Sequence, residues 1–370
     1  MKIIKTVAVQ LFTGINIATI LFLWACCLVT YLSPAAFPRL TLLSLTFPLF
    51  LGLNVVFIIF WLIFKVKRVW LPLLGLAACF SFVRDYCPVN PSFLQPSDTL
   101  AALRIISYNT HGFGGKAAND EDGNNSVADF IYACDADIIC LQEASGGGIP
   151  LPTVKARMEE MGYEYANNKG TTIFSRLHIL DADTLPLATR TNAGVMAYLQ
   201  DGQDTILLIN NHFESNHLTQ IIKDDYRDAL EKHAPNVYQR DIRDTIRKEL
   251  RPVVNLLSEA APLRAAQANA IQELIEAWLP RSVILCGDFN DTPVSYTLRV
   301  LGSHLQNAFR ESGNGVGFTF QDRGFPVRID HILFSGDQWR SRHSRVEKAI
   351  SASDHFPIST ELVRETLKNP

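Results

Sequence analysis

The chain has 370 residues, of which 48% are hydrophobic and 19% are charged, and its formal net charge is -3. This composition excludes a disordered, collagen-like or disulfide-scaffold protein, and the length suits one large domain or two ordinary ones. The charge is unevenly distributed, because residues 1–90 contain seven basic residues and one acidic residue, whereas residues 91–370 contain 27 basic and 36 acidic ones. An apolar, basic N-terminal region is therefore distinct from an acidic remainder.

The first ninety residues predict membrane-spanning helices. Between Lys5 and Arg39 lie 33 consecutive uncharged residues, and between Arg39 and Lys65 lie 25 more. A helix needs about 20 predominantly apolar residues to cross the hydrocarbon core of a bilayer. The first stretch is also longer than the apolar region of a cleavable signal peptide. We therefore predict spans at about 7–32 and 42–64.

A third, shorter apolar segment follows. Residues 69–83 are uncharged, but this stretch is only 15 residues long and has Pro72 near its start. We predict a third span at about 69–84, with Trp70 and Tyr86 as anchors at the two interfaces. The alternative is an interfacial or re-entrant segment that does not cross.

The basic residues predict the orientation of these helices. Lys65, Lys67 and Arg68 form a cluster between the second and third segments. Short cytoplasmic loops are rich in Lys and Arg, so this cluster is expected inside. Three spans then place everything after residue 86 outside, and two spans would place it inside. We predict a multi-pass protein of the cytoplasmic (inner) membrane with its C-terminal domain on the outer, periplasmic side.

Residues 87–101 are predicted to be a linker, because prolines and small polar residues are frequent there. Residues 102–365 are predicted to form an α/β domain, in which apolar runs alternate with helical patterns. The expected strands are Leu103–Tyr108, Ile138–Leu141, Thr171–Phe174, Val195–Leu199, Thr205–Asn210, Ser282–Cys286 and Ile329–Phe334. The expected helices include Ser126–Cys134, Thr153–Met161 and Ala265–Trp278.

A charged segment, residues 217–262, interrupts the alternation and predicts a helical insertion. Its pattern suggests two or three exposed amphipathic helices separated by Pro235, Pro252 and Pro262. One interpretation is a solvated helical excursion. The other is a lid or docking element, because the segment follows shortly after His212.

Polar side chains collect where the predicted strands end. Taken singly, each has an ordinary explanation as a turn former or a solvated group. Together they predict a common site, because open α/β sheets place ligand-binding groups beyond strand ends. The residues concerned are Asn109, Glu143, His212, Asp288, Asn290, Asp330, Asp354 and His355.

The residue types suit hydrolysis of a phosphate ester. Asn109 and Glu143 offer hard oxygen ligands, which suit Mg²⁺ or Mn²⁺ better than a soft metal. An Asp can serve as the base that orients water, and an Asn two residues later can donate to the phosphate. A protonated His that is held by a carboxylate supplies a cationic donor.

The ordered motifs YN, QE, NHF, GDFN, RIDHI and SDHFP resemble the endonuclease/exonuclease/phosphatase superfamily, which has the deoxyribonuclease I-like fold. The resemblance covers about residues 104–362. Arg264 and Gln267 are similar to an Arg-x-x-Gln pattern of this family, and His331 stands where many members have Tyr. The resemblance implies a four-layer α/β sandwich of two packed β-sheets flanked by helices, preceded here by the N-terminal helical transmembrane region.

The resemblance also implies a metal site that takes Mg²⁺ (or Mn²⁺). Asn109 and Glu143 match the metal-site positions, with Glu143 as the direct ligand, and Asp354 matches a second metal-proximal carboxylate. His111 is a departure, because several members have an acidic residue there. A second metal site at that position is therefore not expected.

Five residues match the reacting positions of the family. Asp288 matches the aspartate that activates the attacking water, and Asn290 matches the partner that orients the phosphate. His355 matches the histidine that contacts the scissile phosphate, and Asp330 matches the carboxylate that orients this histidine. His212 matches the second histidine of the deoxyribonuclease and sphingomyelinase branches, a donor to the phosphate or to the leaving group.

Fold alone does not determine the substrate. Residues 91–370 have 36 acidic against 27 basic residues, whereas binding a nucleic acid backbone requires a basic surface. The short linker also keeps the domain close to lipid head groups. We therefore predict a phosphodiesterase or phosphatase that acts on a lipid head group or a small phosphoester. The alternatives are a nuclease and a catalytically silent, membrane-anchored binding protein. The predicted partners are the phosphoester substrate and the lipid bilayer, and the oligomeric state is left open.

Overall fold

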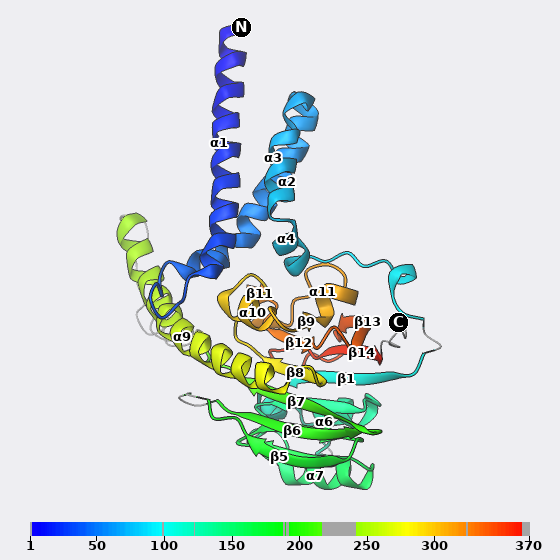
Figure 1. Ribbon diagram of the computed structural model, residues 1–370. Coiled ribbons are helices and arrows are strands. Elements are labelled where there is room, and N and C mark those ends of the chain that lie inside the picture. The colour runs from blue at the N-terminus through cyan, green and yellow to red at the C-terminus, as the bar shows by residue number, and fades with distance from the viewer. Residues whose placement is uncertain are drawn as a thin grey trace.

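The computed structural model describes residues 2–97, 100–121, 123–187, 189, 192–216, 242–322 and 325–364. Apolar N-terminal helices project from one side of an α/β domain (Figure 1). These two parts correspond to the division that the charge distribution indicates.

Two N-terminal helices are long and apolar enough to cross a membrane. The qualifying segments are Thr6–Tyr31, which includes most of α1 (Lys2–Leu28), and Thr41–Phe64, which includes α2 (Phe47–Phe64). They agree with the predicted spans at 7–32 and 42–64.

The third predicted span, 69–84, is not one straight helix. It is divided into α3 (Trp70–Ala78) and α4 (Phe80–Tyr86), and the helical segments on either side of the break are bent by 74°. The break lies at Cys79, whose φ of -117° and ψ of 25° are not helical. The segment counts as a third crossing only if the bent pair is taken as one span.

Buried polar side chains join the apolar helices. Asn16 of α1 donates from Nδ2 to Oδ1 of Asn54 of α2 at 3.3 Å, and its own Oδ1 accepts from Trp61 Nε1 at 3.0 Å. Trp24 Nε1 donates to the carbonyl of Gly75 in α3 at 2.9 Å. Asn16, Trp61 and Trp24, which lie on apolar helices, thus each have a hydrogen-bond partner on another helix.

The α/β domain contains two six-stranded sheets. The first has the order β13-β14-β1-β2-β4-β3 and the second has the order β5-β6-β7-β8-β12-β9. The strands of the first sheet are β1 (Ala102–Asn109), β2 (Ile138–Gln142), β3 (Glu164–Asn168), β4 (Thr171–Ser175), β13 (Trp339–Val346) and β14 (Ile358–Arg364). Those of the second are β5 (Ile179–Thr184), β6 (Gly194–Asp201), β7 (Asp204–His212), β8 (Val283–Asp288), β9 (Gln306–Asn307) and β12 (Asp330–Phe334). A separate hairpin joins β10 (Phe320–Asp322) and β11 (Phe325–Val327).

Three apolar clusters show that the domain has four layers. One cluster lies between the sheets and combines residues such as Ile138, Leu208 and Ile284. A second lies between the first sheet and the helices α6 (Ser126–Ala133) and α7 (Leu151–Glu160). The third lies between the second sheet and the helices α9 (Ile242–Trp278) and α10 (Tyr296–Leu301). The arrangement of helices, sheet, sheet and helices confirms the predicted four-layer sandwich. The shorter helices are α5 (His111–Gly114) and α11 (Ala308–Ser312).

All seven predicted strands are present, and the three predicted helices correspond to α6, α7 and the C-terminal part of α9, with α6 and α7 each ending one residue earlier than predicted. One expectation about the insertion is wrong, because Pro252 and Pro262 lie inside the continuous helix α9 instead of separating two helices. Ala260, Ala261 and Ala265 are buried, so the packing of this part of the helix outweighs the local cost of Pro262. Residues 217–241, which include Pro235, lie outside the described residues.

The end of α4 and the residues that follow it are fixed to the α/β domain. Asn90 is buried and donates from Nδ2 to the carbonyls of Arg310, at 2.9 Å, and Gly313, at 2.7 Å. The buried guanidinium of Arg328 donates to the carbonyl of Tyr86 at 3.3 Å and also to that of Asp85. The predicted linker, 87–101, therefore begins with residues that pack on the domain.

Candidate active site

The pairing of the central strands brings the predicted residues to one end of the two sheets. The parallel pair β7 and β8 places His212 opposite Asp288, and the antiparallel pair β8 and β12 places Asp288 opposite Asp330. Asn109, at the end of β1 in the other sheet, reaches across and donates from Nδ2 to Asp288 Oδ2 at 3.0 Å. Residues that are far apart in the sequence thus share one buried site.

Gly287 allows β7 and β8 to approach each other closely at this end. Its φ is +144°, and a Cβ atom at this position would lie 1.9 Å from the carbonyl oxygen of Asn211. A side chain there would separate the strands one residue before His212 and Asp288. The glycine of the GDFN motif is therefore a packing requirement of the site.

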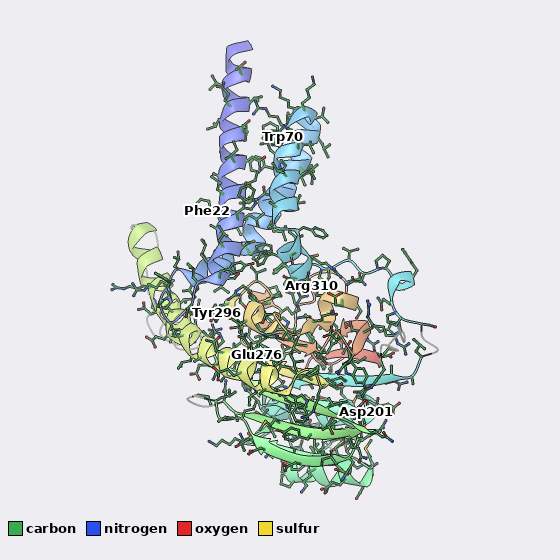
Figure 2. The ribbon with its side chains drawn as sticks, in the orientation of Figure 1. Phe22, Trp70, Asp201, Glu276, Tyr296 and Arg310 are labelled. Carbon is green, nitrogen blue, oxygen red and sulfur yellow. The ribbon has the colours of Figure 1, made fainter. Side chains whose placement is uncertain are left out.

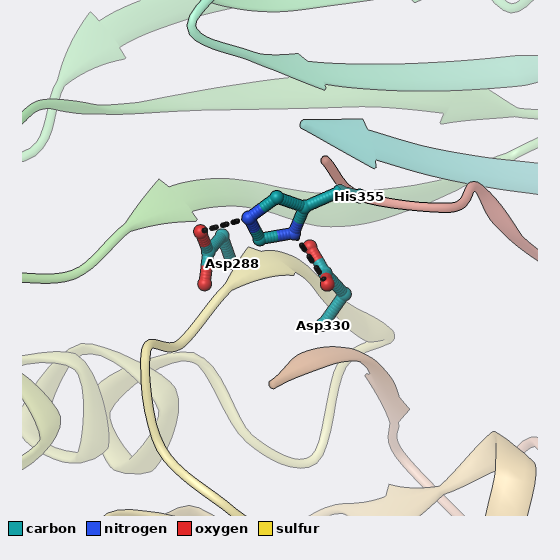
Figure 3. A group of neighbouring side chains, drawn as sticks. All are labelled: Asp288, Asp330 and His355. Atoms are coloured by element: carbon teal, nitrogen blue, oxygen red, sulfur yellow. Dashed lines mark hydrogen bonds and ion pairs between the residues drawn. The ribbon is translucent and has the colours of Figure 1, made fainter. Parts of the chain in front are cut away.

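His355 lies between two carboxylates (Figure 3). Its Nδ1 is 2.9 Å from Asp330 Oδ2, and its Nε2 is 3.7 Å from Asp288 Oδ2. Burial alone would lower the pKa of His355, but the charges of Asp330 and Asp288 raise it to about 10. The imidazole is therefore a buried cation at neutral pH.

Asp288 is buried and accepts hydrogen bonds at both oxygens. Oδ1 accepts from the backbone N–H of Asn290 at 2.8 Å, and Oδ2 accepts from Asn109. Burial, together with the charge of Asp330, raises the pKa of Asp288. A raised pKa suits a carboxylate that takes a proton from water.

Asn290 and His212 complete this side of the site. Asn290 has a φ of +49° and donates from Nδ2 to the carbonyl of Phe213 at 3.1 Å, so one amide hydrogen holds its orientation. The buried Nε2 of His212 lies 3.5 Å from Asp288 Oδ2 and 3.7 Å from Glu143 Oε1. Within the described part of the chain, this nitrogen makes no hydrogen bond. It is therefore available to a further hydrogen-bond partner.

Glu143 and Asp354 form the candidate metal centre. Glu143 Oε1 accepts from Asn109 Nδ2 at 3.1 Å. The Nδ1 atom of His111 lies 3.4 Å from Glu143 Oε2 and 3.6 Å from Asp354 Oδ1. Burial alone would raise the pKa of Glu143, but the hydrogen bond with His111 and the charge of His212 lower it to about 2. The hydrogen bond with Glu143 in turn raises the pKa of His111.

This donor set fits a hard divalent cation. The two carboxylates, Glu143 and Asp354, converge, and an imidazole nitrogen of His111 lies between them, where positive charge is favourable. Asn109 turns its Nδ2, and not its oxygen, toward Glu143, and its Oδ1 accepts from the backbone N–H of His111 at 3.1 Å. His111, which the sequence identifies as a departure from the family, thus contacts both predicted acidic ligands.

A second group of possible metal ligands is Asp288, Asp330 and His355, whose ligand atoms lie within 4.8 Å of one another. In this group, however, His355 already uses Nδ1 for its bond to Asp330. A cation here would also compete with a protonated imidazole. We therefore interpret this trio as the reacting group and the Glu143 cluster as the metal centre.

Arg264 and Gln267 hold the chain just beyond His212. Gln267 Oε1 accepts from the backbone N–H of Glu214 at 3.0 Å, and Arg264 Nη1 donates to the Glu214 carbonyl at 3.1 Å and to Asn216 Oδ1 at 2.7 Å. Arg264 Nε also lies 3.8 Å from Asp291 Oδ2. The Arg-x-x-Gln pattern therefore has a structural role next to the site.

Replacing Arg264 with Met should destabilise the fold by about 3 kcal/mol or more, because it removes the buried guanidinium and leaves the half-buried Asp291 without its cationic neighbour. Denaturant unfolding of the full-length protein in detergent measures this loss. Arg157→Met is the matched control, since Arg157 forms an exposed pair with Glu160. Equal losses in the two variants would contradict the structural role of Arg264.

Thr319, which belongs to no motif, positions Asp330, and His331 of the RIDHI motif is a buried neighbour of the site. Thr319 Oγ1 accepts from the backbone N–H groups of Ile329, at 3.1 Å, and Asp330, at 3.2 Å. His331 Nε2 lies 3.3 Å from the Asp291 carbonyl, and burial lowers the pKa of His331 to about 3. His331 is therefore a neutral structural group. An isolated Thr outside the predicted strands offers no sequence signal by which Thr319 could have been found.

Comparisons with known proteins agree with this division of the chain. The model of the Endonuclease/Exonuclease/phosphatase family matches residues 106–355. The model of a domain of unknown function (DUF8431) matches residues 9–86. A comparison with curated proteins gave no significant match.

Several solved structures are similar in fold. TDP2 from C. elegans is 19% identical, with coverage of 72% of this chain and 77% of that chain and a TM-score of 0.49. The human Nocturnin catalytic domain is 14% identical, with coverage of 75% of this chain and 99% of that chain and a TM-score of 0.49. The mannosyl-6-phosphatase Bt3783 from Bacteroides thetaiotaomicron is 18% identical, with coverage of 70% and 99% and a TM-score of 0.46. Identities this low do not bear on the substrate. Because the family model covers more than half of the chain, the protein belongs to the Endonuclease/Exonuclease/phosphatase family, a family of phosphoester hydrolases.

Proposed function

We propose that the protein is a membrane-anchored hydrolase that cleaves a phosphodiester or a phosphomonoester with the help of a divalent cation. The observation that carries this proposal is the buried His355, which is held between Asp330 and Asp288. A cationic donor fixed in a site that excludes water stabilises the negative charge that develops during phosphoryl transfer. The adjacent Glu143 cluster supplies the acidic ligands that such a reaction requires.

Asp288 and Asn290 prepare the attacking water. Asp288 takes a proton from the water, and the hydrogen bonds from Asn109 and from the Asn290 backbone hold the carboxylate in place. One Nδ2 hydrogen of Asn290 is bonded to Phe213, and the second can donate to the phosphate.

His355 and His212 hold the phosphoryl group. His355 donates from Nε2 to a phosphoryl oxygen while Asp330 keeps its ring oriented and protonated. His212 Nε2, which is buried and directed at the same space, donates to another oxygen of the phosphate or to the leaving group.

Glu143 and Asp354 would hold Mg²⁺ or Mn²⁺ directly, and Asn109 would orient Glu143 through the hydrogen bond from its Nδ2. Such a cation, when bound, neutralises charge on the phosphoryl oxygens. Asn109 links the two halves of the site, because its Nδ2 donates both to Glu143 and to Asp288.

The substrate that we propose is a lipid head group or a small phosphoester close to the membrane. The excess of acidic over basic residues in 91–370 disfavours binding of a long polyanion. The hydrogen bonds of Asn90 with Arg310 and of Tyr86 with Arg328 also support a catalytic domain that stays next to the apolar helices.

Turnover of a chromogenic phosphodiester by the full-length protein in detergent tests the proposed activity. We expect Mg²⁺-dependent hydrolysis of bis(p-nitrophenyl) phosphate, and lack of turnover would favour a catalytically silent binding protein. Assays with phospholipid, sphingomyelin, inositol phosphate and DNA then identify the class of substrate. Faster turnover of DNA than of every other substrate would establish the nuclease alternative instead.

We also propose that the catalytic domain lies on the outer side of the cytoplasmic membrane. Arg68, which follows the Lys65–Lys67 cluster, bonds to Thr13 in the first half of α1, whereas the carbonyl of Thr30, just beyond α1, accepts from Arg299 of the domain. The basic cluster and the domain therefore lie toward opposite ends of the apolar helices (Figure 1). With the basic cluster inside, this arrangement supports an outer location of the domain.

A topology reporter provides the test of this location. Alkaline phosphatase fused after Pro91 should be active, because it folds only outside the cytoplasm, and green fluorescent protein at the same position should be dark. The opposite pair of results would mean that the bent pair α3–α4 does not cross.

A further inference from the structure

A cavity of about 430 Å³ lies where the apolar helices meet the catalytic domain. Its walls come from both parts of the protein, and they include Tyr31, Ser81, Phe82, Arg299, Arg310 and Glu311. We call it the junction cavity. Its volume is within the range of small-ligand sites. None of the residues assigned to the catalytic site lines it.

The position of the junction cavity corresponds to the head-group layer of a bilayer that the apolar helices would cross. Figure 2 shows Phe22 and Trp70 along these helices, and Tyr296 and Arg310 on the face of the domain below them. Tyr31, at the end of the first apolar segment, is 60% exposed. Tyrosine at the end of an apolar span is typical of the membrane interface.

Arg299 is held rigidly in the wall of this cavity. Its Nε donates to the carbonyl of Thr30 at 2.8 Å. The guanidinium carbon lies 4.8 Å from the ring centroid of Tyr31 and 5.3 Å from that of Tyr296. Because Nε is used and the aromatic rings fix the plane of the group, the two Nη atoms form a preoriented fork.

The two arginines of the cavity, Arg299 and Arg310, differ in whether a carboxylate pairs with them. Arg310 pairs with Asp85 and lies 3.4 Å from Glu311 Oε1. In the part of the chain that the structure describes, Arg299 makes no ion pair with a carboxylate. The junction cavity therefore contains one fixed cation without a counterion, which favours an anionic ligand.

We propose that the junction cavity binds the phosphate of a phospholipid head group through Arg299. The planar guanidinium matches the geometry of a phosphate oxygen pair, and Phe82 and Leu298 provide apolar wall beside it. This inference rests on the proposed membrane insertion but not on the proposed hydrolysis. A lipid in this position is a bound component of the structure and not the substrate.

Native mass spectrometry of the full-length protein in detergent tests this site. The probes are dioleoyl phosphatidylglycerol, dioleoylglycerol, which lacks the phosphate, and inorganic phosphate. Wild-type protein should retain the phospholipid in preference to dioleoylglycerol. Arg299→Gln should weaken phospholipid binding at least about tenfold, because a charge-assisted pair of hydrogen bonds is lost. Arg157→Gln, on the exposed face of α7, should bind as the wild type does.

Three results would overturn the proposal. They are equal phospholipid binding by the wild type and Arg299→Gln, equal retention of dioleoylglycerol and phospholipid, and inorganic phosphate binding as tightly as the phospholipid. If Arg299→Gln does not fold, Ser81→Trp provides a second test, since it fills the junction cavity from α4. Phospholipid binding that is unchanged by Ser81→Trp would also refute the site.

The outcome can be separated from that of the proposed function. Flotation of the full-length protein with liposomes reports on membrane insertion, and bis(p-nitrophenyl) phosphate turnover reports on hydrolysis. A protein that floats but does not discriminate between the lipids refutes only the junction site. Turnover should be unchanged in Arg299→Gln, because Arg299 does not contribute to the catalytic site.

Discussion

Replacing His355 with Ala should lower kcat at least about a hundredfold, measured below the temperature at which the variant unfolds. If the cationic imidazole donates to the phosphoryl oxygens, its removal costs about 3–4 kcal/mol of transition-state stabilisation, by analogy with the loss of one oxyanion donor. The effect should fall on kcat more than on KM, because this interaction strengthens as charge develops. Steady-state kinetics on the chromogenic diester would measure it.

Asp330→Asn should produce a smaller defect of the same kind, since Asp330 acts through His355. The double variant should be far less impaired than the product of the two single defects, because the two residues form one unit. Multiplicative defects, or defects that follow a loss of thermal stability, would show that the residues are independent structural groups. The mechanism would then be wrong.

The pH dependence supplies another measure of this pair. Because the pKa of His355 is raised to about 10, against about 6.5 for a free imidazole, the ring stays protonated through neutral pH. On the alkaline side, activity should therefore be kept until the pH rises toward 10, and Asp330→Asn should move this alkaline limb to lower pH. The same cation stabilises the fold fully below about pH 6.5, and this contribution is lost as the pH rises through 10.

Removal of divalent cations should abolish hydrolysis, and addition of Mg²⁺ or Mn²⁺ should restore it. The pKa of Glu143 is about 2, so its carboxylate is negatively charged at all working pH values. Glu143→Gln keeps the size of the side chain but removes this charge. The Mg²⁺ concentration for half-maximal activity should rise by more than about tenfold, since even indirect partners of metal ligands contribute this much.

Glu160→Gln is the matched control, because Glu160 is an exposed carboxylate in the α7 pair with Arg157. A titration of activity against free Mg²⁺ should leave this variant indistinguishable from the wild type. Full activity of Glu143→Gln at low Mg²⁺ would remove Glu143 from the metal centre.

The central strands could be predicted because their residues are apolar on both faces. β2 and β8, for example, are buried at every position. Edge strands lack this signal. β5 is exposed over most of its length, and β13 contains several charged residues and a register shift between Arg342 and Arg345. Pairing with a neighbour determines such strands, and pairing cannot be read from local apolar content.

The candidate site could be named residue by residue because each member follows a buried strand or belongs to a motif. What could not be predicted is the set of contacts between them. Asn109 bonds to both Glu143 and Asp288, and His111 lies between two carboxylates. These contacts depend on how the two sheets face each other. The bend at Cys79 was missed for a similar reason, since an apolar run does not indicate where a helix changes direction.

The pairing of Asn16 with Asn54 bears on how the chain enters a membrane during synthesis. A lone α1 in lipid would leave the amide of Asn16 with only its 3.5 Å contact to Thr19 of the same helix, because its other partners, Asn54 and Trp61, lie in α2. Delivering one helix at a time would leave that amide in hydrocarbon until the second helix arrived. Biogenesis is therefore expected to retain α1 beside the insertion machinery until α2 has been made, so that both helices are released into the lipid together as a hairpin.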